Sequence, residues 1–148
     1  MNILITGIPG TGKTTIGEYL VQHHGFTHFD MEVSRGEKFD QQFNTFNILE
    51  GNKVITWGFM PGTHDDIVLQ FKNMGYRMIW FDGDRPSARR EFIKRGTVSV
   101  DALNKQISRI NKLDLAIFNP IQINTFNQNG KFRDKEEICE EIINAVCK

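Results

Sequence analysis

Apolar positions along the chain follow two spacings that alternate from one end to the other. Short continuous apolar runs predict buried strands, at residues 2–6, 26–30, 53–57, 76–81 and 121–125. Apolar residues three and four positions apart predict helices between them, at 13–24, 36–50, from a cap at Thr63 to about Met74, 86–95, 99–113 and 134–146. Strands alternating with helices form a parallel sheet covered on both faces. The pattern therefore predicts an α/β fold, a three-layer sandwich with about five parallel strands, in a single domain over 1–148.

Glycines and polar residues predict where several of these helices begin and end. Gly25 and Gly75 are placed to stop the helices before them. Thr63 precedes an acidic first turn, so we expect its side chain to cap that helix. The helix at 36–50 should present one apolar face, formed by Phe39, Phe43, Phe46 and Leu49.

Composition excludes several classes of protein. Of 148 residues, 39% are hydrophobic and 24% are charged, and 18 Lys and Arg balance 18 Asp and Glu. The zero net charge gives no global electrostatic reason to expect a nucleic-acid or membrane partner. No charged leader precedes the strand at residue 2, so we expect no secretory signal and a cytoplasmic location. Cys139 and Cys147 lie too far apart along one predicted helix to pair, so we expect free thiols.

The first loop carries the strongest chemical signal. Residues 7–14 fit the phosphate-loop pattern G-x-x-x-x-G-K-[ST], between a predicted strand and a predicted helix as the motif requires. Backbone N–H groups of such a loop cradle phosphate, Lys13 can reach the β- and γ-phosphates, and the Thr14 hydroxyl can hold Mg²⁺. No segment resembles the guanine-specific N-K-x-D pattern, which favours ATP over GTP. We expect the nucleotide to contact Gly7, Pro9, Gly10, Thr11, Gly12, Lys13, Thr14 and Thr15.

Four segments resemble the small P-loop kinases, the group of shikimate, gluconate and adenylate kinases. The loop through Thr15 is typical of the group, and Phe29-Asp30-Met31-Glu32 is similar to the F-x-D-x-D segment of shikimate kinases, with Glu in place of the second Asp. Residues 79–82 followed by Arg90 and Arg95 resemble the fourth strand and the arginine-bearing helix that enters the lid. Residues 100–110, which include Gln106, are similar to the segment after the gluconate kinase lid.

This resemblance implies the P-loop NTPase fold with a short helical lid at approximately 85–113. It leaves the phosphoryl acceptor open, because Gly58-Phe59-Met60 stands where shikimate kinases have three glycines. The AMP-binding pattern of adenylate kinases is not evident either. By position, the resemblance implies that Asn124 to Phe126 seat the adenine.

Asp30 is the candidate carboxylate on the acceptor side. At the end of a strand facing the phosphate loop, it could orient an acceptor hydroxyl, accept its proton or hold Mg²⁺ through water. It could also be a turn or capping residue. Glu32 is a weaker candidate for the same role, and it could simply face solvent. Arg35, which follows them, could meet an anionic acceptor, although surface charge is slightly preferred.

The segment 85–95 holds the densest cationic cluster, Arg85, Arg89, Arg90, Lys94 and Arg95. Arginines that swing over a γ-phosphate stabilise the charge that spreads during transfer, and we assign this catalytic role to Arg90 and Arg95. The alternative is a solvated helix face. The cluster also resembles a nucleic-acid patch, but its aromatic neighbours Phe81 and Phe92 are expected in the core.

Other residues near strand ends are expected to have structural roles. Asp82 follows an apolar strand as a metal-binding carboxylate would, but a turn is the preferred interpretation. Trp57, Phe59 and Phe46 could line an acceptor pocket, but aromatic residues at such positions usually pack in the core.

The sequence therefore predicts an ATP-dependent phosphotransferase that moves the γ-phosphate to a small-molecule acceptor, a hydroxy acid or sugar-like compound. ATP and Mg²⁺ are the expected cofactors, with Lys13, Asp30, Arg90 and Arg95 as catalytic residues and Thr14 and Asp30 at the metal. Two alternatives stay open, a nucleoside monophosphate kinase and a nucleotide-binding module without transfer activity.

Overall fold

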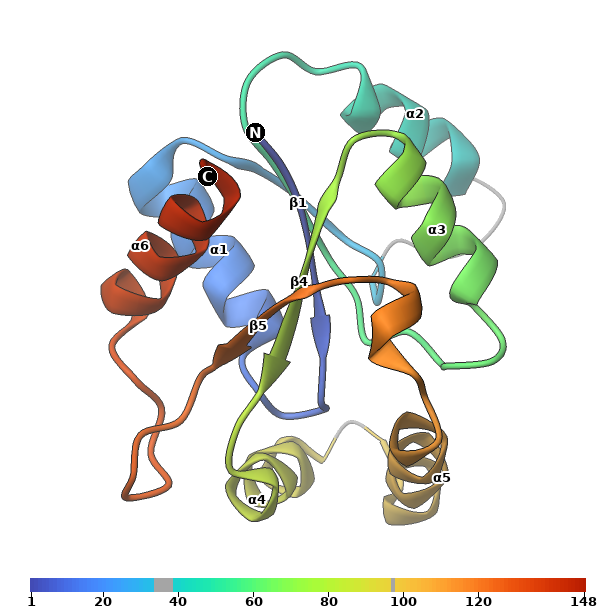
Figure 1. Ribbon diagram of the computed structural model, residues 1–148, viewed down its shortest axis with the longest axis vertical. Helices are drawn as coiled ribbons and strands as arrows, with labels where there is room; N and C mark the ends of the chain where they lie inside the picture. Colours follow the sequence, from blue (N-terminus) through green and yellow to red (C-terminus); the bar gives the residue numbers. More distant parts are fainter. Residues whose placement is uncertain (34–38, 97) are drawn as a thin grey trace.

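The strands form one parallel sheet in the computed structural model, which describes residues 1–33, 39–96 and 98–148 (Figure 1). The sheet has five strands in the order β2-β3-β1-β4-β5. Its register places Leu4 of the central strand beside Ile55 on one side and Met78 on the other. These apolar strands need cover on both faces, as parallel sheets generally do. The strands are β1 (Asn2–Gly7), β2 (Thr27–Asp30), β3 (Lys53–Thr56), β4 (Arg77–Asp82) and β5 (Ile121–Asn124).

Helices cover both faces of the sheet, so the predicted three-layer fold is confirmed. α1 (Lys13–His24) and α6 (Lys135–Val146) lie on one face, and α2 (Phe39–Asn47) and α3 (Asp65–Asn73) lie on the other (Figure 1). Two more helices, α4 (Arg85–Arg95) and α5 (Val100–Asn111), lie beyond the carboxyl ends of the strands (Figure 1). A short 3₁₀ helix (Leu115–Ile117) returns the chain to β5.

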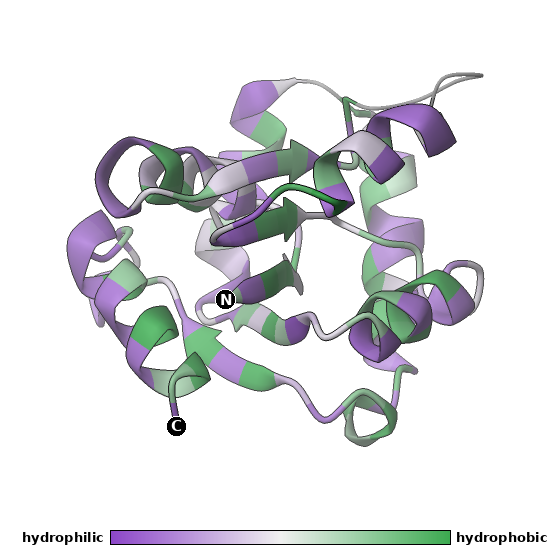
Figure 2. Cartoon of the chain, turned by 90° about the horizontal axis from the view of Figure 1, so that it is seen from above, coloured by the Kyte–Doolittle hydropathy of each residue, from purple (hydrophilic) through white to green (hydrophobic). Residues whose placement is uncertain are grey.

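Two hydrophobic cores hold these layers together. The core beneath α1 and α6 is mainly aliphatic, with Ile5, Leu20 and Ile142 completely buried. The core beneath α2 and α3 is rich in aromatic rings, which pack edge to face or tilted against one another. Figure 2 shows the apolar strands inside a mainly hydrophilic shell of helices. Because Trp57 and Phe59 are buried in the aromatic core, the core interpretation of these rings holds and they do not line an acceptor pocket.

Two predictions about the helices on the aromatic side were wrong. Thr63 does not cap α3: His64 occupies the N-cap position without a side-chain capping bond, and the Thr63 hydroxyl accepts a hydrogen bond from Arg109. α2 ends at Asn47, so Leu49 lies beyond it and is 43% exposed instead of completing the apolar face. Phe43 and Phe46 are buried as predicted. The predicted helix start at 36 and Arg35 lie outside the described residues.

Within the described parts of the chain, none of the helices combines the length and apolar character needed to cross a bilayer. Both cysteines are free thiols, as expected: Cys139 is buried in α6 and Cys147 is exposed.

Candidate functional site

The loop between β1 and α1 forms an anion cradle. Gly10 and Gly12 have φ angles of 82° and 86°, in the left-handed region that favours glycine. The Thr11 hydroxyl closes the loop by donating to the carbonyl oxygen of Ile8 at 2.6 Å. Gly12 occupies the N-cap of α1 and has no side chain to accept from the first-turn N–H groups. In the described residues those N–H groups therefore remain available to an anion at the positive end of the helix dipole.

Lys13 and Thr14, at the start of α1, project toward the end of β2. The Lys13 ammonium donates to the Ile8 carbonyl oxygen at 3.0 Å, so it lies across its own loop. The Thr14 hydroxyl donates to Oδ2 of Asp30 at 3.4 Å, and Oδ1 of Asp30 accepts from the backbone N–H of Glu32 at 2.9 Å. β2 ends at Asp30, so the fold brings this carboxylate to the cradle from sixteen residues away.

Burial lowers the pKa of Lys13 to about 8. The carboxylates of Glu32 and Asp30 oppose this shift, and the Arg95 guanidinium adds to it. These contributions show that two anions and one further cation surround the ammonium group. A lysine with this pKa remains mostly protonated at neutral pH and loses its charge as the pH rises through about 8.

We expect the affinity for Mg-ATP to fall about tenfold between about pH 7 and about pH 9. The protonated ammonium binds phosphate. When the pH is above the Lys13 pKa of about 8, most of the protein has lost this proton and must regain it to bind. Isothermal titration calorimetry at the two pH values checks this. Lys13→Arg is the matched control, because a guanidinium stays charged throughout and its affinity should change little. Equal pH dependence of the two proteins would contradict the assignment.

A second group of contacts surrounds Gly58, directly after β3. Oε1 of Glu32 accepts from its backbone N–H at 3.0 Å, and Nε2 of Gln106 donates to its carbonyl oxygen at 3.2 Å. A Cβ on Gly58 would lie 3.6 Å from Cε of Lys13, so this peptide borders the lysine. Glu32 is exposed, and its carboxylate contacts the peptide that borders Lys13. The Glu32 carboxylate and the Gln106 amide thus both hold the Gly58 peptide beside Lys13.

α5 contributes contacts to this side of the site to which sequence analysis had assigned no role. Besides Gln106, Arg109 donates to the carbonyl oxygen of Pro61 at 3.4 Å and to the Thr63 hydroxyl at 2.7 Å. The available signal was helical spacing: Leu103 and Ile110 are buried, and Gln106 and Arg109 share their side of α5.

The two arginines predicted to be catalytic lie in different places on α4. Arg95 is near enough to Lys13 to lower its pKa, and its guanidinium lies 5.4 Å from the centre of the Phe92 ring. Arg90 instead donates to the Ser87 hydroxyl at 2.8 Å, on the side of α4 that faces Gly130. Arg95 is thus near enough to act on Lys13, and Arg90 is held at Ser87.

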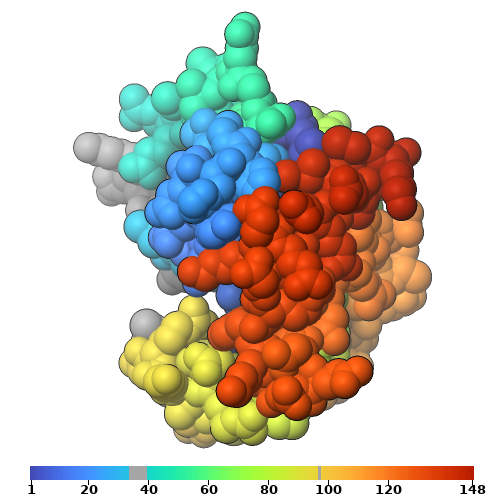
Figure 3. Space-filling view, turned by 90° about the vertical axis from the view of Figure 1, so that its left-hand side faces the viewer, coloured from blue at the N-terminus to red at the C-terminus, as the bar shows by residue number. Residues whose placement is uncertain are grey.

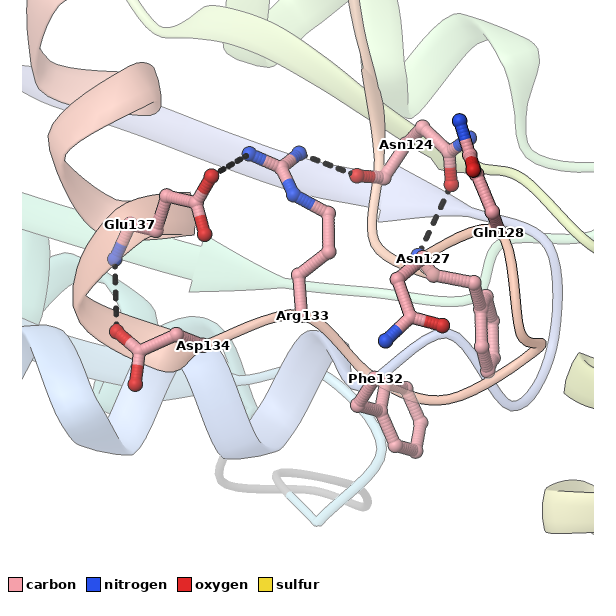
Figure 4. A pocket seen from close by; sticks show the side chains of 8 residues that line it. Asn124, Asn127, Gln128, Phe132, Arg133, Asp134 and Glu137 are labelled. Carbon is pink, nitrogen blue, oxygen red and sulfur yellow. Dashed lines mark hydrogen bonds and ion pairs between the residues drawn. The ribbon is translucent and has the colours of Figure 1, made fainter.

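A cavity of about 440 Å³ lies beside the loop after β5 (Figure 4). The Phe132 ring stacks on Phe126 with centroids 4.6 Å apart, and it would lie 3.3 Å from a Cβ on Gly12. The cavity therefore borders the phosphate cradle and includes Asn124 and Phe126, the ends of the segment expected to seat a base. Its lining residues are Asn124, Phe126, Asn127, Gln128, Phe132, Arg133, Asp134 and Glu137.

The oxygen donors fit Mg²⁺ better than a metal held entirely by protein. In the described residues no three His, Cys, Asp or Glu side chains converge on one point. Thr14 and Asp30 offer a hydroxyl and a carboxylate 3.4 Å apart, and Mg²⁺ commonly takes one or two such ligands together with phosphate and water. Asp82 has the expected turn role, because it accepts from Gly83 N–H at 2.9 Å and from Arg85 at 3.4 Å.

Comparison with solved structures gives the fold of small P-loop kinases, as the sequence resemblance implied. Shikimate kinase from Bacteroides thetaiotaomicron is similar with a TM-score of 0.64 and 18% identity, over 100% of this chain and 99% of that one. A gluconokinase from Sinorhizobium meliloti 1021 is similar with a TM-score of 0.63 and 12% identity, over 99% of this chain and 91% of that one. Shikimate kinase from Acinetobacter baumannii, in complex with shikimate, has a TM-score of 0.62 and 17% identity, over 99% of this chain and 95% of that one.

Sequence comparison gives a shorter match. An adenylate kinase isoenzyme 6 homolog of Caenorhabditis elegans is 36% identical over 59 residues, which are 36% of this chain and 32% of that protein. The match thus spans about a third of the relative's length. No family model matches the chain.

Proposed function

We propose that this chain, which has the fold of the small P-loop kinases, is an ATP-dependent phosphotransferase acting on a hydroxyl group of a small molecule. The observation that carries the proposal is the position of Asp30 and Glu32 across the cradle from α1. A phosphate-binding loop alone can hold a nucleotide. Carboxylates on the far side of the γ-phosphate position provide what a transfer reaction needs in addition, a group that orients the incoming hydroxyl and takes its proton.

On the donor side, the loop from Gly7 to Thr15 would hold the polyphosphate through its backbone N–H groups. Lys13 would pair with the β- and γ-phosphates, and Thr14 with Asp30 would hold Mg²⁺. When bound, Mg²⁺ neutralises charge that develops on the phosphate oxygens. The cavity beside Phe132 would take the adenine, because it borders the cradle and presents an aromatic face on which a base can stack.

On the acceptor side, the hydroxyl oxygen attacks the γ-phosphorus in line with the departing ADP oxygen, and its proton passes to Asp30. The Glu32 carboxylate and the Gln106 amide, which both hold the Gly58 peptide, would contact the rest of the acceptor. Arg95 would stabilise charge on the transferring group when the lid closes and water is excluded. Arg90 is bonded to the Ser87 hydroxyl, so a catalytic role would require its side chain to leave this contact.

Asp30→Asn is expected to lower the transfer rate about a hundredfold while weakening Mg-ATP binding much less. The amide keeps the shape and a hydrogen bond to Thr14, but it cannot accept the acceptor's proton. Single-turnover transfer from labelled ATP measures the rate, and calorimetry measures binding. Asp66→Asn, on the exposed side of α3, removes the same charge and should leave both unchanged. Equal rates for the two variants would exclude Asp30 as the base.

A nucleoside monophosphate kinase is the second candidate, favoured by the match to an adenylate kinase isoenzyme 6 homolog. The two activities share the donor site and differ in the product. A panel of hydroxy acids, sugars, nucleosides and nucleoside monophosphates separates them, since one activity makes a new phosphate ester and the other makes a nucleoside diphosphate from a monophosphate. Stable nucleotide binding without turnover on any acceptor would support a non-catalytic module instead.

A further inference from the structure

Positive charge is concentrated in the two helices at the carboxyl end of the sheet. Residues 85–112 contain eight cationic residues (Lys and Arg) and two acidic residues (Asp and Glu). The rest of the chain contains ten cationic and sixteen acidic residues. The zero net charge of the whole protein therefore conceals a cationic end and an acidic remainder. Because charges interact over roughly 10 Å at ordinary salt, a partner near α4 and α5 is affected by the local excess and not by the average.

Part of this charge has no role in the site described above. Arg95 is near Lys13, Arg109 is bonded to Pro61 and Thr63, and Arg85 pairs with Asp82. Arg90 is bonded to the Ser87 hydroxyl. Four further exposed cations remain for which the described residues provide no ion-pair partner. We call them the outer lid surface: Arg89, Lys94, Lys105 and Lys112.

The three lysines of the outer lid surface lie opposite the buried residues of their helices, and Arg89 lies between the two helices, bonded to Asn104. In α4, Lys94 is two positions past the buried Phe92, about 200° around the helix. In α5, Lys105 and Lys112 are each two positions past a buried residue, Leu103 and Ile110. Figure 1 shows α4 and α5 at one end of the molecule, beyond the strands, and Figure 3 shows α4 at the same end.

Amide side chains hold the two helices side by side without neutralising them. Arg89 donates to Oδ1 of Asn104 at 2.7 Å, and Arg85 donates to Oδ1 of Asn111 at 2.7 Å. These bonds restrict the guanidinium groups and leave their charge intact. Arg89 is thereby held between the two helices, and Lys105 and Lys112 are about 10 Å apart along α5.

We propose that the outer lid surface binds the phosphate backbone of a single-stranded nucleic acid. Separate cations along a surface suit a chain of phosphates, which gains free energy by releasing counterions from each one. A small anion would occupy one cation and leave the others unused. Ile93 on α4 and Val100 on α5 are the large apolar side chains exposed on these two helices, too few to form the apolar face with which amphipathic helices enter a bilayer.

The test uses the full chain and a fluorescein-labelled oligouridylate of about 20 nucleotides, with binding followed by anisotropy between about 50 and 200 mM KCl. Neutralising four phosphates predicts a slope of about −3 for log affinity against log salt concentration. The triple variant R89E/K94E/K105E should lose at least tenfold in affinity. The control R77E/K135E/K148E has the same net charge, changes exposed cations on other elements, and should bind within about threefold of the parent chain.

Three outcomes would overturn the proposal: no binding at the lowest salt, equal loss in the two triple variants, or tighter binding to phosphatidylserine vesicles than to RNA. If the lid variant does not fold by circular dichroism, K94A and K105A replace it, and each should reduce the salt slope by about 0.7. Lys13→Ala should keep RNA binding while losing Mg-ATP binding. The outcome is thereby independent of the proposed kinase activity.

Discussion

Lys13→Ala is expected to reduce phosphoryl transfer about a thousandfold and to weaken Mg-ATP binding severely. Lys13 is the cation enclosed by the cradle: it contacts the Ile8 carbonyl at 3.0 Å and has two carboxylates and Arg95 around it. In such a partly buried position, a charge acts on phosphate more strongly than it would in water. Transfer from radiolabelled ATP and calorimetric titration with Mg-ATP measure the two effects.

Loss of folding is not the expected cause of this result, because burial of the ammonium lowers its pKa and so works against the folded state at neutral pH. The thermal midpoint of Lys13→Ala should equal or exceed that of the parent chain. Lys72→Ala, in α3, removes a lysine on another element and should leave transfer unchanged. Parent-like turnover in Lys13→Ala would refute the donor site.

Gly10→Ala is expected to destabilise the fold by more than about 3 kcal/mol. A Cβ on Gly10 would overlap the carbonyl oxygen of Ala88 and lie 3.1 Å from the backbone nitrogen of Phe92. These are backbone atoms of α4, which cannot rotate away as a side chain would. The left-handed φ of 82° adds strain of its own. Urea unfolding measures the change in the free energy of unfolding.

Gly75→Ala separates the overlap from the backbone strain. Gly75 also has a left-handed φ, of 94°, but a Cβ there meets no atom within 4 Å. It should cost only the strain, about 1 to 2 kcal/mol. If the two variants lose equal stability, the close contact between the phosphate loop and α4 is not as described.

The strands, the phosphate loop and Asp30 were predictable because each depends on local sequence. An apolar run predicts a buried strand, and the rule that parallel strands end at one edge places Asp30 beside the loop. The Thr63 prediction failed for a tertiary reason: Arg109, 46 residues away, takes the hydroxyl that would otherwise cap α3. Intrinsic capping preference is too weak to outweigh such a contact.

The contributions of α5 could not be derived from spacing along the chain. Gln106 reaches Gly58 across 48 residues, and only the packing of α5 over the end of β3 makes that possible. Arg90 and Arg95 are similarly indistinguishable in sequence, since both follow β4 on one cationic helix. The different positions of the two arginines depend on which side of α4 packs against the phosphate loop. That side is the one with Ala88 and Phe92, whose backbone atoms lie against Gly10.

Phosphorus-31 NMR of the chain with Mg-ATP and the acceptor panel tests the central claim most directly. We expect a new phosphate-ester resonance with one acceptor class, in step with formation of ADP, and we expect it to be absent when Lys13→Ala replaces the parent chain. Release of inorganic phosphate alone, or unchanged ATP with every acceptor, would contradict it.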